Sequence, residues 1–192
     1  SLRRISITGD LNQEEYRDLD PDAAIDSRTD VKTPRIKGRL PNLTFNTKLF
    51  DLAIRQTKLT GSLPTFEDNP LIALIDLSAN EISGYLPALD LNQLTSLNLS
   101  DNYIVSNDDN EWPVWRLPLC TLIDLHYNSL SGAVPSFSNI PLLSTLNIAN
   151  NNLSVFNTGT LNQNYRLKTL NLSNNNFGQT SLENILNDLL NN

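Results

Sequence analysis

The chain has 192 residues, of which 39% are hydrophobic and 18% are charged, and its formal net charge is −7. This composition is ordinary for a globular domain. The sequence contains no apolar run long enough to cross a membrane, and the negative net charge argues against general nucleic-acid binding. The only cysteine, Cys120, excludes an internal disulfide, so stability must come from the close contact of core side chains.

Residues 1–33 are expected to form an N-terminal cap over one end of the core. Residues 2–7 look like a short first strand, and Asn12 begins a pattern typical of a helix N-terminus. We therefore expect a short helix over residues 13–19. Residues 20–33 are rich in aspartate and indicate no regular element.

A repeated motif runs through residues 34–178. Residues 94–104 read L-x-x-L-x-L-x-x-N-x-L, and the same pattern recurs in five other segments. Its asparagine place, here called the register position, is occupied by Thr57, Asn80, Asn102, Asn128, Asn151 and Asn175. The spacings of 23, 22, 26, 23 and 24 residues stay in phase over most of the chain, which indicates a solenoid of stacked coils.

Four coils also contain an apolar-x-Gly-x-apolar-Pro motif, at residues 36–41, 59–64, 82–87 and 130–135. With this second motif the sequence resembles the plant-type leucine-rich-repeat family over roughly residues 34–178. The resemblance implies an α/β-type solenoid, which is a right-handed, curved superhelix with a concave parallel β-sheet and few helices. It also implies a second short strand after each register position.

Each residue type in the repeat has an expected place. The leucines of the L-x-L core should turn inward, and the residues between them should face outward. The register asparagines should bond to backbone groups of the turns and stack as a ladder. One more apolar residue per coil should form a spine on the convex side: Leu43, Phe66, Leu89, Trp112, Phe137, Leu161 and Ile185.

Residues 179–192 predict a C-terminal helical cap. Thr180 and Glu183 fit a capping box at the start of a helix. Apolar residues then recur at helical spacing, at Leu182, Ile185, Leu186 and Leu189. We expect this face to close the core over the last coil.

The sequence shows no recognisable catalytic constellation, so we expect no enzyme activity, no cofactor and no metal. Cys120 occupies a leucine place, which predicts a buried, inert thiol. His126, the only histidine, directly follows a strand and should face the concave side. Acidic stretches at residues 18–22 and 107–111 favour solvated loops, with calcium binding as the alternative.

The concave sheet face is the expected binding surface. Most of its residues are Asn, Ser and Thr, which are typical of a solvated sheet, but Leu74 and Leu122 are apolar exceptions. A solvated face gains nothing from exposed leucine, so these residues and their charged and aromatic neighbours predict a protein-binding site. The predicted site consists of Leu74, Asp76, Asp101, Leu122, Asp124, His126 and Tyr127.

Two other groups are candidate secondary contacts. The coil between Asn102 and Asn128 is longer than the others and carries Trp115. This tryptophan either packs locally, as we favour, or is presented to a partner. Arg35, Lys37 and Arg39 alternate along one short strand. We favour a charged edge that resists aggregation, and the alternative is a docking site for an acidic partner or anionic glycan.

These observations favour a non-enzymatic recognition module that binds a protein, or alternatively a glycan, without inserting into a membrane. The resemblance supports this, because such repeats generally serve as interaction surfaces, and an extracellular or surface-exposed location is expected. The alternative is a structural or adhesin-like domain of a larger cell-surface or virion assembly. The absence of methionine fits a processed chain or part of a longer protein.

Overall fold

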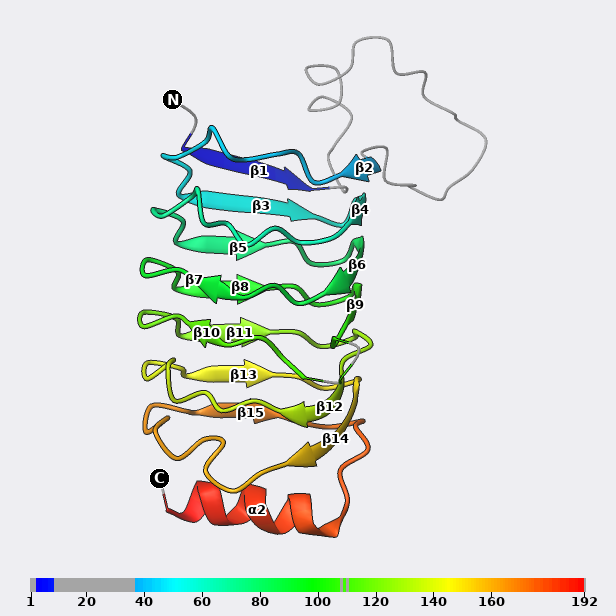
Figure 1. The fold of residues 1–192 in the computed structure, drawn as a ribbon, viewed down its shortest axis with the longest axis vertical. Helices are drawn as coiled ribbons and strands as arrows, with labels where there is room; N and C mark the ends of the chain where they lie inside the picture. Colours follow the sequence, from blue (N-terminus) through cyan, green and yellow to red (C-terminus); the bar gives the residue numbers. More distant parts are fainter. Residues whose placement is uncertain (1–2, 9–36, 108, 110, 192) are drawn as a thin grey trace, which may run out of the picture.

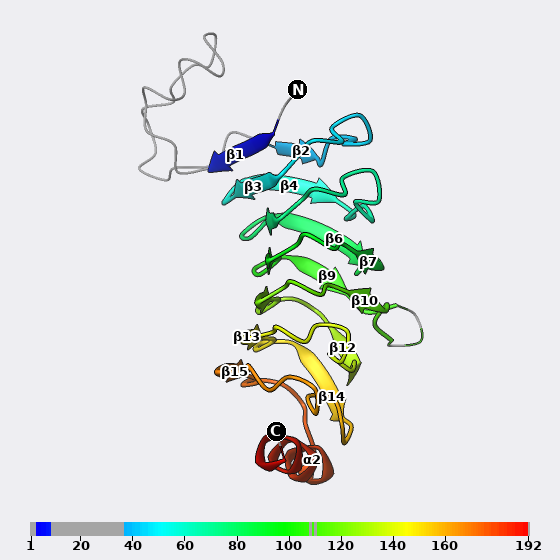
Figure 2. The ribbon, with the colours of Figure 1, turned by 90° about the vertical axis from the view of Figure 1, so that its left-hand side faces the viewer.

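The computed structural model describes residues 3–8, 37–107, 109 and 111–191, and these form a solenoid of stacked coils (Figure 1). One strand from each coil joins a seven-stranded parallel sheet along the solenoid axis. Figure 2 shows that this sheet lines the concave side. Its strands, in spatial order, are β1 (Arg4–Thr8), β3 (Asp51–Arg55), β5 (Leu74–Asp76), β8 (Ser96–Asn98), β11 (Leu122–Asp124), β13 (Thr145–Asn147) and β15 (Thr169–Asn171).

A second short strand follows the register positions from Thr57 to Asn151, as the family resemblance implies, but none follows Asn175, where the chain enters helix α2 (Gln179–Leu190). These strands form two separate flanking sheets. The first contains β2 (Lys37–Arg39), β4 (Lys58–Gly61), β6 (Glu81–Tyr85) and β9 (Tyr103–Val105), and the second contains β12 (Ser131–Val134) and β14 (Asn152–Phe156). Only an isolated bridge between Val105 and Ser129 joins the two sheets among the described residues. The break coincides with the 26-residue spacing between Asn102 and Asn128, so the insertion in this coil, the fourth counted from β1, interrupts the pairing of the flanking strands.

The core is a continuous column of aliphatic side chains between the concave sheet and the convex side. The inward residues of the middle strands, including Ile75, Leu97, Ile123 and Leu146, are almost fully buried. All seven predicted convex-spine residues are buried as well. No single coil could bury these side chains alone, so stacking supplies most of the hydrophobic stabilisation.

The register asparagines form the predicted ladder. The Asn102 amide donates to the carbonyls of Leu77, Leu99 and Ser100 at 3.0–3.1 Å, and its oxygen accepts the Ile82 N–H at 3.0 Å. The same arrangement recurs at Asn80, Asn128, Asn151 and Asn175. Each amide therefore links two coils and satisfies backbone groups that stacking removes from water.

The residue before each register position adopts a left-handed backbone conformation. These residues are Gln56, Ala79, Asp101, Tyr127, Asn150 and Asn174, with φ between 51° and 59°. The turn that aims the register amide inward requires this conformation in every coil. Asn tolerates it better than Ala or Tyr does, because its short polar side chain can hydrogen-bond locally.

The insertion in the fourth coil packs both tryptophans against the convex side. Strand β10 (Trp115–Arg116) pairs with β7 (Leu89–Asp90), and the two indole rings lie 6.1 Å apart. The Trp115 Nε1–H donates to the Pro87 carbonyl at 2.9 Å, and the side chain is buried. Local packing of Trp115 is therefore confirmed, and its alternative role as a partner contact is wrong, because its ring has no free surface to offer.

The C-terminal helix α2 (Gln179–Leu190) is confirmed, but two expectations about it are wrong. Its N-cap is Gly178, which makes no side-chain cap bond, so Thr180 does not cap the helix. The face turned to the coil that contains β14 carries Ser181, Ile185 and Asp188. Leu182, Leu186 and Leu189, which were expected to close the core, are exposed.

Backbone groups at the end of the solenoid explain how α2 is oriented. Asp188 accepts the N–H groups of Gly159 and Leu161 at 2.7 and 2.9 Å, and Ser181 accepts the N–H of Phe156 at 3.0 Å. These donors would otherwise lie at an open end without partners. Satisfying them turns the polar side of the helix inward and leaves the leucines in solvent.

Some expectations fall outside the described residues. These are the predicted helix over residues 13–19, the aspartate-rich segment 20–33 and the side chain of Arg35. The first strand does lie within them: β1 pairs in register with β3 from Arg4 opposite Asp51 to Thr8 opposite Arg55.

Candidate functional site

The concave face brings the predicted site residues onto one surface. Leu74 and Asp76 lie on β5, and Leu122 and Asp124 lie on β11, with β8 between these two strands. Because side chains alternate along a strand, all four point away from the buried Ile75 and Ile123. Asp101, His126 and Tyr127 follow the ends of β8 and β11.

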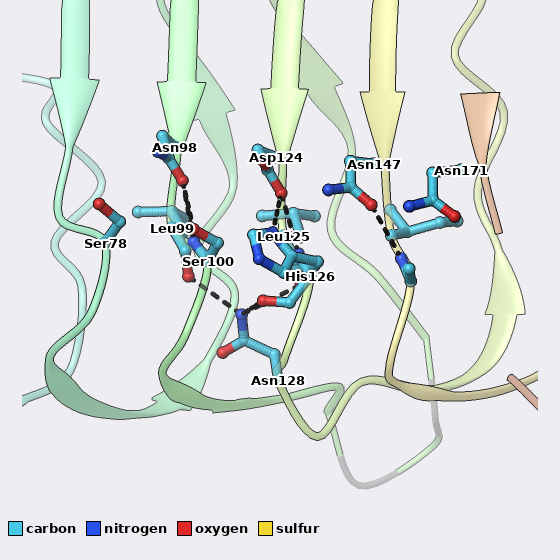
Figure 3. Close-up of polar contacts among 12 residues, drawn as sticks. Ser78, Asn98, Leu99, Ser100, Asp124, Leu125, His126, Asn128, Asn147 and Asn171 are labelled. Carbon is cyan, nitrogen blue, oxygen red and sulfur yellow. Dashed lines mark hydrogen bonds and ion pairs between the residues drawn. The ribbon is translucent and has the colours of Figure 1, made fainter. Parts of the chain in front are cut away.

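A repeated hydrogen bond shapes the polar part of this face (Figure 3). The side-chain oxygen of the last strand residue accepts the backbone N–H two residues later, an Asx-turn that begins where each strand ends. It is formed by Asp76, Asn98, Asp124, Asn147 and Asn171, at N···O distances of 3.1–3.3 Å. These oxygens are therefore held in place before any partner arrives.

Two ion pairs that the sequence did not reveal stiffen the N-terminal half of the face. Arg55 Nε lies 2.6 Å from Asp76 Oδ2, and Arg4 Nε lies 2.6 Å from Asp51 Oδ2. Each pair joins adjacent strands. A signal exists in retrospect, because Arg55 stands two residues after a strand residue that pairs in register with Asp76.

His126 and Tyr127 form the aromatic part of the site. His126 Nδ1 lies 2.6 Å from Asp124 Oδ1, and because a carboxylate can only accept, Nδ1 carries the proton. The imidazole and phenol rings lie 5.3 Å apart. Tyr127 is 55% exposed on a backbone with φ of 51°, so this ring stands out into solvent at the end of β11.

The apolar residues of the site are half-buried. Leu74 lies beside Ser96 in the sheet, and Leu122 lies on the other side of Ser96. Asp101 is exposed and left-handed at φ 59°. The structure thus places an apolar pair, three carboxylates and two aromatic rings across neighbouring coils.

The secondary candidates lie elsewhere. Lys37 and Arg39 are exposed on β2, at the edge of the first flanking sheet and away from the concave face. The Arg39 side chain lies over Gly61 of the next coil, where a β-carbon would come 3.3 Å from its Cγ. Their proposed contact with an acidic partner remains a prediction.

Cys120 has the environment of a core residue. Burial raises the pKa of its thiol to about 12, although hydrogen bonds to the backbone at Leu122 and Leu97 oppose the shift. A thiol with this pKa is protonated at neutral pH and is a poor nucleophile. Among the described residues, no group of three or more His, Cys, Asp or Glu side chains is placed to hold a metal ion.

One family model matches part of the chain. The model described as Leucine Rich Repeat matches residues 166–189, which contain the last coil and most of α2. No curated protein sequence matches the chain. In the part of the chain that the structure describes, no helix has the length and apolar character needed to cross a membrane.

Solved structures share the fold. A pollen receptor kinase 3 matches with a TM-score of 0.63 and 19% identity, covering 76% of this chain and 72% of its own. The Arabidopsis receptor kinase HAESA, in complex with the peptide hormone IDA and the co-receptor SERK1, matches with a TM-score of 0.54 and 24% identity, covering 71% of this chain and 27% of its own.

A third similar structure is the LRR ectodomain of the membrane receptor kinase GASSHO1/SCHENGEN3 from Arabidopsis thaliana, in complex with Casparian strip integrity factor 2. Its TM-score is 0.51 and its identity 22%, covering 78% of this chain and 22% of its own. The chain thus spans about a quarter of the length of two of these three structures. The family match over residues 166–189 and the shared fold show that the chain is a solenoid with the leucine-rich-repeat fold, and its repeat pattern resembles the plant type.

Proposed function

We propose that this chain is a non-enzymatic recognition module that binds a protein partner on its concave face, in an extracellular setting. The contact residues are Leu74, Asp76, Asp101, Leu122, Asp124, His126 and Tyr127. Two similar solenoids are solved in complex with a peptide hormone or an integrity factor, which supports a polypeptide ligand over a glycan.

The observation that carries the proposal is the prearranged concave surface. Asp76 and Asp124 are held by hydrogen bonds to their own turns, and the Arg55–Asp76 pair joins two strands. A surface that is already ordered loses less conformational entropy when a partner binds. Half-buried leucines and an exposed tyrosine beside these groups provide the mixture of contacts that interface hot spots use.

Tyr127 supplies an independent argument. Its backbone is left-handed, a conformation that costs a bulky residue more than it costs the asparagines at the same place in the next two coils. The fold would be served better by Asn, so the exposed ring is best explained by a contact with another molecule.

A selection from a displayed peptide library tests this proposal. Peptides selected on the wild-type chain are measured against a face variant with Leu74→Ser, Leu122→Ser and Tyr127→Ala. A control variant, with Leu182→Ser and Leu186→Ser, removes exposed leucines from α2. Loss of a hot-spot residue costs at least about 2 kcal/mol, so the face variant should bind at least about 30-fold more weakly.

The control variant should bind like the wild type, and both variants should melt within a few degrees of it. Selected peptides that bind the face variant with unchanged affinity would show that recognition does not use the concave face.

A further inference from the structure

A β-turn precedes each strand of the concave sheet from β3 onward. In each turn the backbone N–H of the apolar residue two positions before the strand donates to the carbonyl three residues earlier, at 2.8–3.3 Å. The residues that donate are Leu49, Ile72, Leu94, Cys120, Leu143 and Leu167. The two central residues of such a turn project away from the core. In Figure 1 these turns lie along the edge from which the sheet arrows start.

Three of these turns carry the dipeptide Pro-Leu at their centre, at residues 70–71, 118–119 and 141–142. Proline suits the first central place because its fixed φ matches the turn. The leucine has no such reason. Leu71 is 48% exposed and Leu119 is 40% exposed, while the turns of the other coils hold Lys48, Gln93 and Arg166 at the same place. The fold therefore accepts polar residues here and does not require the leucines.

These turn leucines lie at the edge of the concave sheet, close along the chain to its apolar residues. Leu74 follows Leu71 by three residues, and Leu122 follows Leu119 by three residues. In the coil between them the corresponding residues are Gln93 and Ser96. Two apolar pairs thus stand two coils apart, which is roughly 10 Å at about 4.8 Å per strand. Leu142, in the coil after Leu119, extends the second pair. We call these five leucines the leucine border.

The polar groups beside the leucine border are mainly acidic. Asp76 and Asp124 follow Leu74 and Leu122 on the same strands, and Asp101 lies at the end of the strand between them. The described cations on the outer face of the seven strands are Arg4 and Arg55, and each is already paired with an aspartate. Because Asp76 is paired with Arg55, the excess negative charge in the middle of the face comes from Asp101 and Asp124.

We infer that the leucine border is the apolar half of the binding surface, and that its ligand is a cationic polypeptide segment in the polyproline II conformation. This inference rests on the proposed function and specifies the ligand. A polyproline II helix repeats every three residues with a rise of about 3.1 Å each, so side chains three apart lie on one side about 9.3 Å apart. That repeat matches the two-coil spacing of the leucine pairs. Leucines at every third position would contact the border, and interleaved arginines would face the carboxylates.

The test uses a labelled twelve-residue peptide with four Pro-Leu-Arg repeats, measured by fluorescence polarisation. One control peptide replaces leucine with serine, and the other replaces arginine with glutamate. We expect saturable binding of the first peptide and at least about tenfold weaker binding of both controls, because one removes the apolar contacts and the other reverses the charge.

Variants of the chain locate the contact. Leu71→Ser with Leu119→Ser should weaken binding of the Pro-Leu-Arg peptide at least about tenfold, whereas Leu182→Ser with Leu186→Ser should leave it unchanged. Asp124→Asn should weaken binding and reduce its dependence on salt, whereas Glu183→Gln on α2 should do neither. All four variants alter exposed or half-exposed side chains, so thermal melting should confirm that each is folded.

Failure to bind the Pro-Leu-Arg peptide, or equal binding to the Leu71 and Leu119 variant, would overturn the inference. The proposed function would still stand if library-selected peptides depend on Leu74, Leu122 and Tyr127 but not on Leu71 and Leu119. It would fail separately if selected peptides ignore the concave face altogether.

Discussion

At the scale of single residues, buried amides hold this solenoid together. Each register asparagine sits between two coils and bonds to backbone carbonyls from both, so one side chain satisfies backbone groups of two coils at once. Thr57 makes a smaller version of the same link, since its hydroxyl donates to the Asn80 side-chain oxygen. Positions with the most buried partners should be the least tolerant of change.

Replacing Asn102 tests this cost directly. Asn102→Ala removes the side-chain partner of the Leu77 and Leu99 carbonyls and of the Ile82 N–H in a buried site, whereas the Ser100 carbonyl keeps the Ala79 N–H. Each unsatisfied buried group costs about 1–3 kcal/mol, and part of the loss is relieved by water, so we expect the free energy of unfolding to fall by about 2–4 kcal/mol. Urea unfolding measures the change. Asn92→Ala, in an exposed turn, should change stability by less than about 0.5 kcal/mol.

Ala79 tests the left-handed column. Its φ is 55°, a conformation that costs a non-glycine residue about 1–2 kcal/mol. Glycine removes this cost. It also raises the conformational entropy of the unfolded chain, but the resulting loss of stability is somewhat smaller. Ala79→Gly should therefore raise the melting temperature slightly. Ala88 is exposed and has no positive φ, so Ala88→Gly should lower it. A decrease in both variants would show that the left-handed turn is not strained.

The Cys120 thiol predicts a dependence on alkaline pH. Burial raises its pKa from 9.0 to about 12, so between these values the folded chain keeps a proton that the unfolded chain loses. Stability from this group is complete below pH 9 and declines as the pH rises towards 12. Cys120→Ser would not show this loss, and unfolding free energies of both proteins at pH 8 and pH 10.5 measure it. A parallel decline in both would exclude the thiol as its source.

At the scale of elements, helix α2 is attached by polar bonds as much as by apolar contact. Only Ile185 among its large apolar residues is buried, whereas Asp188 accepts two backbone N–H groups from the preceding coil. Figure 2 shows α2 beneath β14, on the side away from β15. The helix therefore covers the convex part of the coil that contains β14, and its leucines stay in solvent because backbone donors of that coil determined which face turned inward.

The importance of Asp188 can be measured without unfolding the whole chain. Asp188→Ala removes two charge-assisted hydrogen bonds, each worth about 1.5–3 kcal/mol, and should let the helix separate from the coil that contains β14. Amide hydrogen exchange over residues 179–190 should rise at least tenfold while the middle coils stay protected. Asp188→Asn keeps one acceptor oxygen and should give an intermediate rise. Asn187→Ala, on the exposed side, should leave exchange unchanged.

At the scale of the whole molecule, the solenoid is a one-dimensional stack whose stability depends on contacts between neighbours. The concave sheet is continuous across seven strands, but the flanking sheets are interrupted where the fourth coil carries its insertion. On the N-terminal side of this break, the β7–β10 pairing and the hydrogen bond from Trp115 to Pro87 join the coil that carries the insertion to the coil before it. We therefore expect this junction, the break between the two flanking sheets, to be where cooperative unfolding divides.

Trp115→Ala tests the coil that carries the insertion, next to this break. Loss of this buried ring should cost about 3–5 kcal/mol and divide thermal unfolding into two transitions, because the coils on each side no longer stabilise each other enough. Phe137→Ala removes an aromatic ring of similar burial within the uninterrupted C-terminal coils, and should lower stability without dividing the transition. Calorimetry distinguishes the outcomes, and a single transition in both variants would show that the junction is no weaker than other contacts.

The sequence alone determined the repeat, the phase of the strands and the inward residues. These follow from a period that is local in the chain, because Leu97 and Asn102 occupy their places through spacing within one coil. The convex spine and the buried Cys120 could be predicted for the same reason. The concave residues could be named from alternation along each strand.

Only the tertiary structure decided the features that depend on groups from different coils. The Arg55–Asp76 pair needs two strands in register, and the burial of Trp115 needs the β7–β10 pairing. The orientation of α2 depends on backbone donors of the preceding coil, which no helical periodicity reveals. These contacts join residues more than twenty positions apart in the sequence, and they form only when the coils stack. A pattern within one coil therefore cannot predict them.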